Sequence, residues 1–109
     1  MMPFKILDGA MGSELIKRGL TLPEYIWSAD ANINYPELVL QIHREYVDAG
    51  ADYITTNTFR TTPRAYLKTG INNKKASQMA KNSLMRAVEL AKNTALLTTK
   101  IMGSIAPLE

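Results

Sequence analysis

The stretch from Pro36 to Thr58 constrains the fold most, because a helix pattern passes directly into a strand pattern within it. Apolar residues recur at helical spacing along one face of its first half, namely Leu38, Val39, Ile42, Tyr46 and Val47. Pro36 suits the first position of a helix, and Gly50 suits the position just past its end. The β-rich residues 53–56 then read as a strand.

The same alternation continues on both sides of this stretch. Further elements are predicted as strands at residues 5–7 and 100–105 and as helices at residues 13–18, 64–68 and 75–93. The third strand is expected to break at Ala106 and Pro107, and residues 20–34, which show no period, read as a long ordered loop. The longest helix is expected to bury Ala76, Met79, Ala80, Leu84, Ala87, Val88 and Ala91. This order predicts an α/β fold with right-handed β/α units and a parallel sheet.

The composition excludes several classes of protein. The chain has 109 residues, of which 46% are hydrophobic and 21% charged, as is typical of one globular domain. No apolar run approaches the roughly 18 residues of a membrane span, and the N-terminus lacks signal-peptide features, so a cytoplasmic protein is expected. The formal charge of +3 is a mild bias, typical of a solvated helix face rather than a nucleic-acid surface. Without cysteine, the chain has no disulfide, thiol nucleophile or thiolate metal site.

Small and polar residues follow each predicted strand, namely Asp8, Gly9, Gly12, Thr56, Asn57, Gly103 and Ser104. Because sites in parallel β/α proteins lie at the C-terminal ends of the strands, these residues are expected to converge on one face. The glycines would let the chain turn sharply and offer backbone N–H groups, and Asp8 would accept from an ammonium group, which together suit an amino acid. The competing interpretation is that Asp8 caps the turn or the next helix, and that residues 55–58 make ordinary strand-end hydrogen bonds.

Three further features have structural interpretations. Trp27, taken alone, is typical of a loop residue that anchors in the core. His43 is the single histidine and has no partner nearby in the sequence, so it is interpreted as structural or solvent-facing rather than catalytic. The six methionines are interpreted as packing residues rather than a site.

Four segments, "LDGAMGSELIKRG", "IWSA", "PELVLQIHREYVDAGADYITTNTF" and "GSIAP", resemble the homocysteine S-methyltransferase family in order and spacing. The resemblance implies a (β/α)₈ TIM barrel that uses zinc, held by three cysteines in later strands, to activate the homocysteine thiol. Because such a barrel needs roughly 250 residues, residues 1–109 are expected to be the N-terminal part of the domain. They would form its first three β/α units, an incomplete barrel of parallel strands.

The resemblance also implies which residues contact ligands. Asp8 and Gly9 match the turn that contacts the amino and carboxylate groups of homocysteine. Trp27 matches an aromatic position near the methyl donor, whose cationic group suits an indole face. Thr56, Asn57 and Thr58 match the rim of the second strand, where pocket-lining and supporting hydrogen bonds are expected.

Two functions remain as hypotheses. In the first, the chain is the N-terminal portion of a zinc-dependent enzyme that transfers a methyl group from a donor to homocysteine to form methionine. The donor is not decided by these residues, and the chain alone is expected to be inactive because the metal-binding cysteines are absent. In the second, the chain is a truncated, non-catalytic protein that self-associates through its open sheet edges or pairs with a separately encoded remainder. A phosphate-binding function is disfavoured, because no basic residue accompanies the glycine turn.

Overall fold

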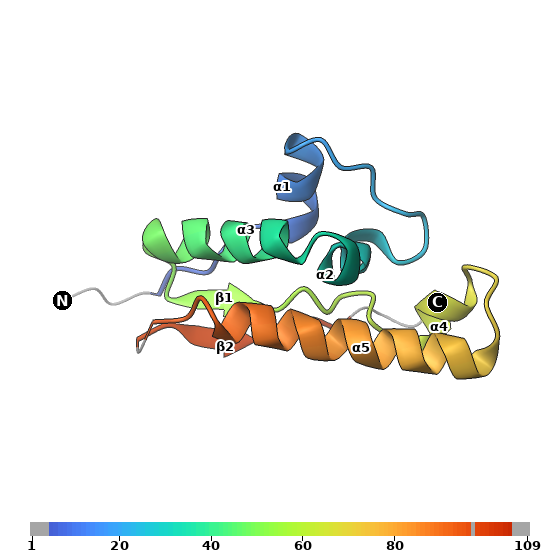
Figure 1. The fold of residues 1–109 in the computed structure, drawn as a ribbon. Coiled ribbons are helices and arrows are strands. Elements are labelled where there is room, and N and C mark those ends of the chain that lie inside the picture. The colour runs from blue at the N-terminus through green and yellow to red at the C-terminus, as the bar shows by residue number, and fades with distance from the viewer. Residues whose placement is uncertain (1–4, 97, 106–109) are drawn as a thin grey trace.

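The computed structural model describes residues 5–96 and 98–105 and shows an α/β arrangement with a small parallel sheet (Figure 1). Along the chain the elements are α1 (Met11–Lys17), the 3₁₀ helix η1 (Trp27–Ala29), α2 (Asp30–Asn34), α3 (Pro36–Asp48), β1 (Tyr53–Thr55), α4 (Pro63–Leu67), α5 (Asn73–Lys92) and β2 (Lys100–Met102). The strands β1 and β2 pair in parallel, with Ile54 opposite Ile101. The structure therefore confirms the predicted α/β class and the parallel pairing of these two strands.

The predicted strand at residues 5–7 is present only as a single β-bridge, so the prediction of a regular strand there is wrong. Leu7 bridges Tyr53 in parallel, and the amide of Asp8 donates to the carbonyl of Tyr53 at 3.0 Å. Asp52 also holds this segment, because its carboxylate accepts a hydrogen bond from the amide of Ile6 at 2.8 Å. The segment therefore lies along β1 and delivers Asp8 and Gly9 to the C-terminal side of the sheet. The third predicted strand, residues 100–105, is regular only over Lys100–Met102, so it is shorter than predicted. The expected break at Ala106 and Pro107 lies outside the described residues.

The best-patterned helix, α3, forms where its apolar spacing predicts. Val39, Ile42 and Val47 are buried on its inner face, and Gly50 follows its end with a φ of +106°. That left-handed conformation suits glycine, so the chain can reverse into β1 within a few residues. Val47 then packs with Ile54 of β1 in one buried cluster, which also includes Ala91 of α5. This cluster joins α3, the sheet and α5.

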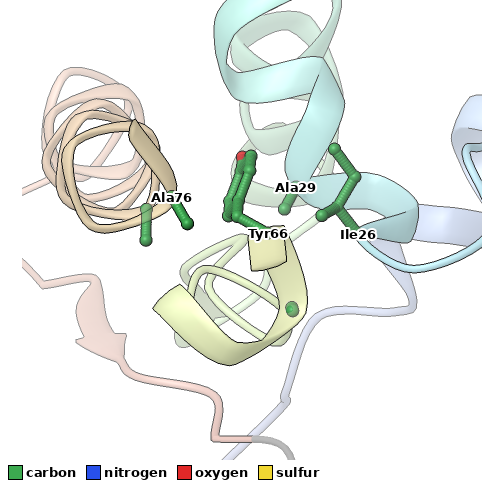
Figure 2. Close-up of a cluster of buried hydrophobic side chains, with 6 residues drawn as sticks. Ile26, Ala29, Tyr66 and Ala76 are labelled. Atoms are coloured by element: carbon green, nitrogen blue, oxygen red, sulfur yellow. The ribbon is translucent and has the colours of Figure 1, made fainter. Parts of the chain in front are cut away.

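Residues 20–34 are not one long loop as predicted, because η1 and α2 form within them. Both elements are too short to show a sequence period. They are held by tertiary contacts instead, since Ile26 and Ala29 are buried against Tyr66 of α4 and Ala76 of α5. Figure 2 shows the Tyr66 ring lying between Ala76 on one side and Ala29 and Ile26 on the other.

The helix α5 buries a stripe of small residues, namely Ala76, Ala80, Ser83, Ala87 and Ala91. Small side chains let the backbones of neighbouring elements approach closely. Of the larger residues expected in the core, Met79 and Leu84 are exposed and Val88 is only half-buried, so the prediction of full burial is wrong for all three. The sequence period located the helix correctly, but its packed face is the one that presents small residues to η1, α2 and α4 and, through Ala91, to α3 and β1.

An ion-pair cluster fastens α1 to α3. The Arg18 guanidinium, just past the end of α1, donates to Glu45 of α3 at 2.7 and 3.2 Å and to Glu14 at 3.2 Å. These bonds raise the pKa of Arg18 and lower the pKa of both glutamates below their ordinary value. The two-pronged contact with Glu45 fixes direction as well as distance. Across residues 5–96 and 98–105, no helix combines the length and apolar character needed to cross a membrane.

Candidate functional site

A cavity of about 520 Å³ lies at the C-terminal side of the parallel segments. Its volume falls within the range of about 300–1,000 Å³ that is usual for small-molecule sites. The wall comprises Leu7, Asp8, Gly9, Ala10, Met11, Gly12, Leu22, Trp27, Ser28, Thr55, Thr56, Asn57, Phe59, Arg60 and Ser104. The strand-end residues expected to converge therefore do so, except Gly103, which lies outside this wall.

Asp8 does not cap α1, so the interpretation of this residue as a helix cap is wrong. The residue before α1 is Ala10, which makes no side-chain capping bond. The Asp8 carboxylate instead accepts from the amide of Thr55 at 2.9 Å through Oδ2 and from the Thr55 hydroxyl at 3.0 Å through Oδ1. Each carboxylate oxygen has a further lone pair. Asp8 is thus oriented by β1 and retains acceptor capacity at the cavity wall.

Gly9 is required by a close approach rather than by an unusual backbone angle. Neither Gly9 nor Gly12 has a positive φ, so the sharp-turn explanation does not apply to them. A Cβ atom at Gly9 would lie 2.5 Å from the Tyr46 hydroxyl oxygen and 3.0 Å from its Cζ atom. At Gly12, an added Cβ would make only ordinary contact with Leu22, at 3.6 Å. The Tyr46 ring of α3 therefore packs directly beneath the turn that carries Asp8.

Asn57 is the centre of a buried polar network. Its Nδ2 donates to the carbonyl of Ser28 at 2.7 Å and to Oδ1 of Asn32 at 3.0 Å, while its Oδ1 accepts from the Ser28 hydroxyl at 2.7 Å. Asn32 returns a bond of 2.9 Å to the Asn57 carbonyl and donates to the Ser83 hydroxyl at 3.1 Å. Ser83 in turn donates to the Ala29 carbonyl at 3.1 Å. The network joins the end of β1 to η1, α2 and α5.

The two threonines that flank Asn57 lie differently. Thr56 lines both the cavity and a second groove of about 440 Å³, whereas Thr58 and Gly103 line only that groove, which Leu84, Val88 and Ile101 also border. The Thr58 hydroxyl donates to the carbonyl of Ser104 at 2.9 Å and accepts from its amide at 3.1 Å. Thr58 therefore acts on the cavity only indirectly, by fixing Ser104 in its wall.

Trp27 lies at the cavity and is not a core anchor. The residue is 51% exposed, and the core contacts of this segment come from its neighbours Ile26 and Ala29. The residue has a φ of +50°, which is uncommon outside glycine and directs the chain into η1. Trp27 therefore lines the cavity, and its contact with the methyl donor stays a prediction.

Eight wall residues were not identified as site residues from the sequence, namely Leu7, Ala10, Met11, Leu22, Ser28, Thr55, Phe59 and Arg60. Phe59 and Arg60 directly follow the strand-end residues, so their position after β1 is the signal that could have identified them. The Arg60 guanidinium lies over the Phe59 ring, with its Cζ atom 5.4 Å from the ring centroid. Met11 and Leu22 are apolar residues that no sequence motif marks as part of a site, and only the folding of the chain brings them into the wall.

His43 is fully buried on the inner face of α3, which excludes the solvent-facing interpretation. Within the described part of the chain, neither ring nitrogen has a hydrogen-bond partner. Burial lowers the pKa of His43 below its ordinary value of 6.5, while the charge of Asp8 acts in the opposite direction. The imidazole is therefore neutral near neutral pH, and it lies close enough to the candidate site to sense Asp8.

We expect His43 to make folding sensitive to acid. Because its pKa is lower in the folded than in the unfolded chain, the unfolded chain binds more protons below about pH 6.5, and stability falls as the pH falls through this value. The slope is at most about 1.4 kcal/mol per pH unit. Urea unfolding at pH 7.5 and 5.5 should show a smaller loss for His43→Leu than for the unchanged chain. Equal losses in the two proteins would contradict this assignment.

The described residues do not form a metal site. They contain no cluster of three histidine, cysteine, aspartate or glutamate side chains with suitable geometry. The sequence as a whole contains no cysteine and one histidine. The cavity is instead suited to binding, because it combines a fixed carboxylate, a guanidinium and an exposed indole.

Comparison with known proteins gives a consistent result. Residues 5–109 match the family described as Homocysteine S-methyltransferase. The chain is 32% identical to the homocysteine S-methyltransferase of Escherichia coli strain K12, over 94% of this chain and 34% of the relative. It is 34% identical to the homocysteine S-methyltransferase YbgG of Bacillus subtilis strain 168, over 80% of this chain and 28% of the relative.

The structural comparison agrees with the sequence comparison. The crystal structure of the homocysteine methyltransferase MmuM from Escherichia coli, in its metallated form, matches with a TM-score of 0.71 and 30% identity. The match covers 94% of this chain and 38% of that chain. The chain thus spans about a third of the length of the relatives it matches.

Proposed function

Because the chain belongs to the homocysteine S-methyltransferase family, we propose that it supplies the homocysteine-binding N-terminal portion of such an enzyme. The completed enzyme would transfer a methyl group from a donor to the homocysteine thiol and form methionine. The observation that carries the proposal is the cavity, where Asp8 is held by two hydrogen bonds from Thr55.

Residues 1–109 would form the N-terminal part of a (β/α)₈ barrel domain. The parallel pairing of β1 with both the Leu7 segment and β2 supports this proposal. Coverage of about a third of the relatives agrees with it, because a barrel of this kind needs roughly 250 residues. The remaining units would close the sheet that is open here.

Different roles are proposed for the predicted site residues. Asp8 would accept from the ammonium group of homocysteine, and Gly9 would contact the amino acid through its backbone N–H group. Trp27 would offer its indole face to a cationic methyl donor. Thr56 would line the pocket, whereas Asn57 and Thr58 would support it, since their side chains are engaged with Ser28, Asn32 and Ser104.

Zinc is proposed only for the completed enzyme. The residues of this chain do not fit a zinc site, because they include no cysteine and no suitable cluster of other ligands among those described. Ligands for a metal would have to come from other parts of the enzyme. The contribution of this chain is to bind and orient the amino acid, and the chain alone would be inactive.

An alternative function is self-association or pairing with a separately encoded remainder. The observation that favours it is the apolar groove beside β2, which Leu84, Val88 and Ile105 line and in which Leu84 and Ile105 are exposed. Surfaces of this kind commonly mark interfaces. A stable, uniform oligomer in light scattering, without affinity for homocysteine, would favour this alternative over the proposed function.

We expect Asp8→Asn to weaken homocysteine binding by about 10- to 100-fold, as for the loss of a charged hydrogen bond. Asparagine has the same shape, can accept from the Thr55 amide and can donate to its hydroxyl, so the fold should persist. Calorimetric titration of the full product of the gene is the measurement. The matched control is Asp48→Asn, at the exposed end of α3. Equal affinity in the Asp8→Asn and Asp48→Asn variants would contradict the role of Asp8.

A further inference from the structure

A buried histidine lies behind the turn that carries Asp8. His43 is 0% exposed on α3, and Tyr46, one turn further along this helix, packs against Gly9. Residues three apart on a helix share a face, so the face that supports the turn also carries His43. We propose that His43 acts on the site through Asp8, so that binding of an ammonium group at Asp8 and binding of a proton by the imidazole oppose each other. This inference rests on the proposed function and deepens it.

The surroundings of His43 compensate a positive charge on its ring poorly. Neither ring nitrogen has a hydrogen-bond partner within residues 5–96 and 98–105, and the neighbouring inner positions of α3 are the apolar residues Val39, Ile42 and Val47. Burying a cation is costly unless it is paired. Burial accordingly lowers the pKa of His43, and the charge of Asp8 is the influence that raises it. A ligand that cancels the charge of Asp8 would remove this support.

Charged groups on the other elements packed against α3 are paired or exposed. The Arg18 guanidinium binds Glu14 of α1 at 3.2 Å and Glu45 of α3 at 2.7 Å. Asp30 of α2 accepts from Asn34 at 2.7 Å, and β1 contains no charged residue. The other charged residues of α1, α3 and α5 are exposed, including Glu89 and Lys92 at the end of α5 that packs against α3. The phenol of Tyr46 has a raised pKa and stays neutral.

The charge of Asp8 acts on His43 from a fixed position. The amide and the hydroxyl of Thr55 hold the two carboxylate oxygens at 2.9 and 3.0 Å. An ammonium group bound to Asp8 would cancel this charge, so a protonated His43 would be less stable than in the empty site. Because coupling between two binding events is reciprocal, a proton on His43 would weaken binding of the ammonium group by the same factor. The site is therefore expected to release such a ligand as the pH falls.

The first part of the test needs no ligand. The protonation of His43 is followed by NMR in the full product of the gene between about pH 7.5 and 5, and its ring signal is identified by its loss in His43→Gln. Asp8→Asn should lower the midpoint of this titration by about one pH unit, as for the loss of a nearby opposite charge. The matched control is Asp48→Asn at the exposed end of α3, which should leave the midpoint unchanged.

The second part uses methionine as the probe, because it carries the ammonium group and its thioether does not titrate. Saturating methionine should lower the His43 midpoint in the unchanged protein, and 3-(methylthio)propylamine, which lacks the carboxylate, should do the same. Calorimetric titration should show that the affinity for methionine falls over this pH range by up to about tenfold, the factor that corresponds to one pH unit.

The outcomes separate this inference from the proposed function. A midpoint that Asp8→Asn leaves in place would overturn the coupling, whether or not methionine binds. A midpoint that responds to Asp8→Asn but not to bound methionine would show that the ammonium group does not neutralise Asp8, and would also overturn the inference. Failure of the unchanged protein to bind either homocysteine or methionine would overturn the proposed function, and the measurement without ligand distinguishes this case from loss of the coupling alone.

Discussion

Asn57→Asp should destabilise the chain by about 3–5 kcal/mol, the cost of an uncompensated buried charge. Asn57 is 4% exposed, and its Nδ2 donates to two oxygens, the Ser28 carbonyl and the Asn32 side chain. In aspartate this nitrogen becomes an oxygen that faces both acceptors. The change conserves size and shape, so a loss of stability would come from hydrogen bonding and charge alone. The measurement is the urea midpoint followed by circular dichroism at pH 7.

The matched control for this prediction is Asn82→Asp, which makes the same chemical change at an exposed position of α5. Its effect should stay within about 0.5 kcal/mol, as is usual for surface substitutions. Lowering the pH should partly restore the Asn57→Asp variant, because a protonated carboxyl can donate one hydrogen bond. Equal midpoints for the two variants at pH 7 would show that the Asn57 network does not hold the fold together.

Gly9→Ala should cost about 1 kcal/mol, the lower end of the range for overpacking, because Gly9 is exposed and the Tyr46 ring is only half-buried. The added methyl group would lie 2.5 Å from the Tyr46 hydroxyl oxygen and 3.1 Å from its Cε1 atom, so the ring must move. The displaced ring would shift the turn that carries Asp8, and homocysteine binding should weaken as well. Urea unfolding and calorimetric titration measure the two effects.

A double-mutant cycle tests whether the contact with Tyr46 causes the loss of stability in Gly9→Ala. With Tyr46→Leu in place, the space beneath the turn should accommodate the methyl group, and Gly9→Ala should then cost much less than it does in the unchanged chain. Gly12→Ala serves as the control, because its methyl group would meet Leu22 at an ordinary 3.6 Å and replace a glycine within α1. That control should be neutral or slightly stabilising. Additive effects of Gly9→Ala and Tyr46→Leu would contradict the contact.

The longer elements were predictable because their signals are local. α3 combines apolar spacing with Pro36 and Gly50, and the structure places it at Pro36–Asp48. α5 was located within two residues at each end. Its buried face was predicted less well, because Met79 and Leu84 were taken as core residues. Which side of a helix is covered depends on its neighbours, and η1 and α2 were not foreseen.

The candidate site was predictable in outline for a different reason. Parallel segments bring their C-terminal ends together whatever their side chains are, so Asp8, Thr56 and Ser104 could be placed at one face. What each residue does there depends on tertiary contacts. The side chain of Asn57 forms hydrogen bonds with Ser28, and Arg60 belongs to the wall although it lies in the turn after β1. Neither fact follows from spacing along the chain.

The Asn57 network also bears on the entropy of ligand binding. One side chain holds both the hydroxyl and the carbonyl of Ser28, at 2.7 Å each, and the neighbouring residue Trp27 belongs to the same wall. A ligand that meets this wall finds its backbone already ordered, so little conformational freedom is lost there on association. Affinity in this site therefore depends less on closing a flexible segment than on the fit of the ligand to a wall fixed from within.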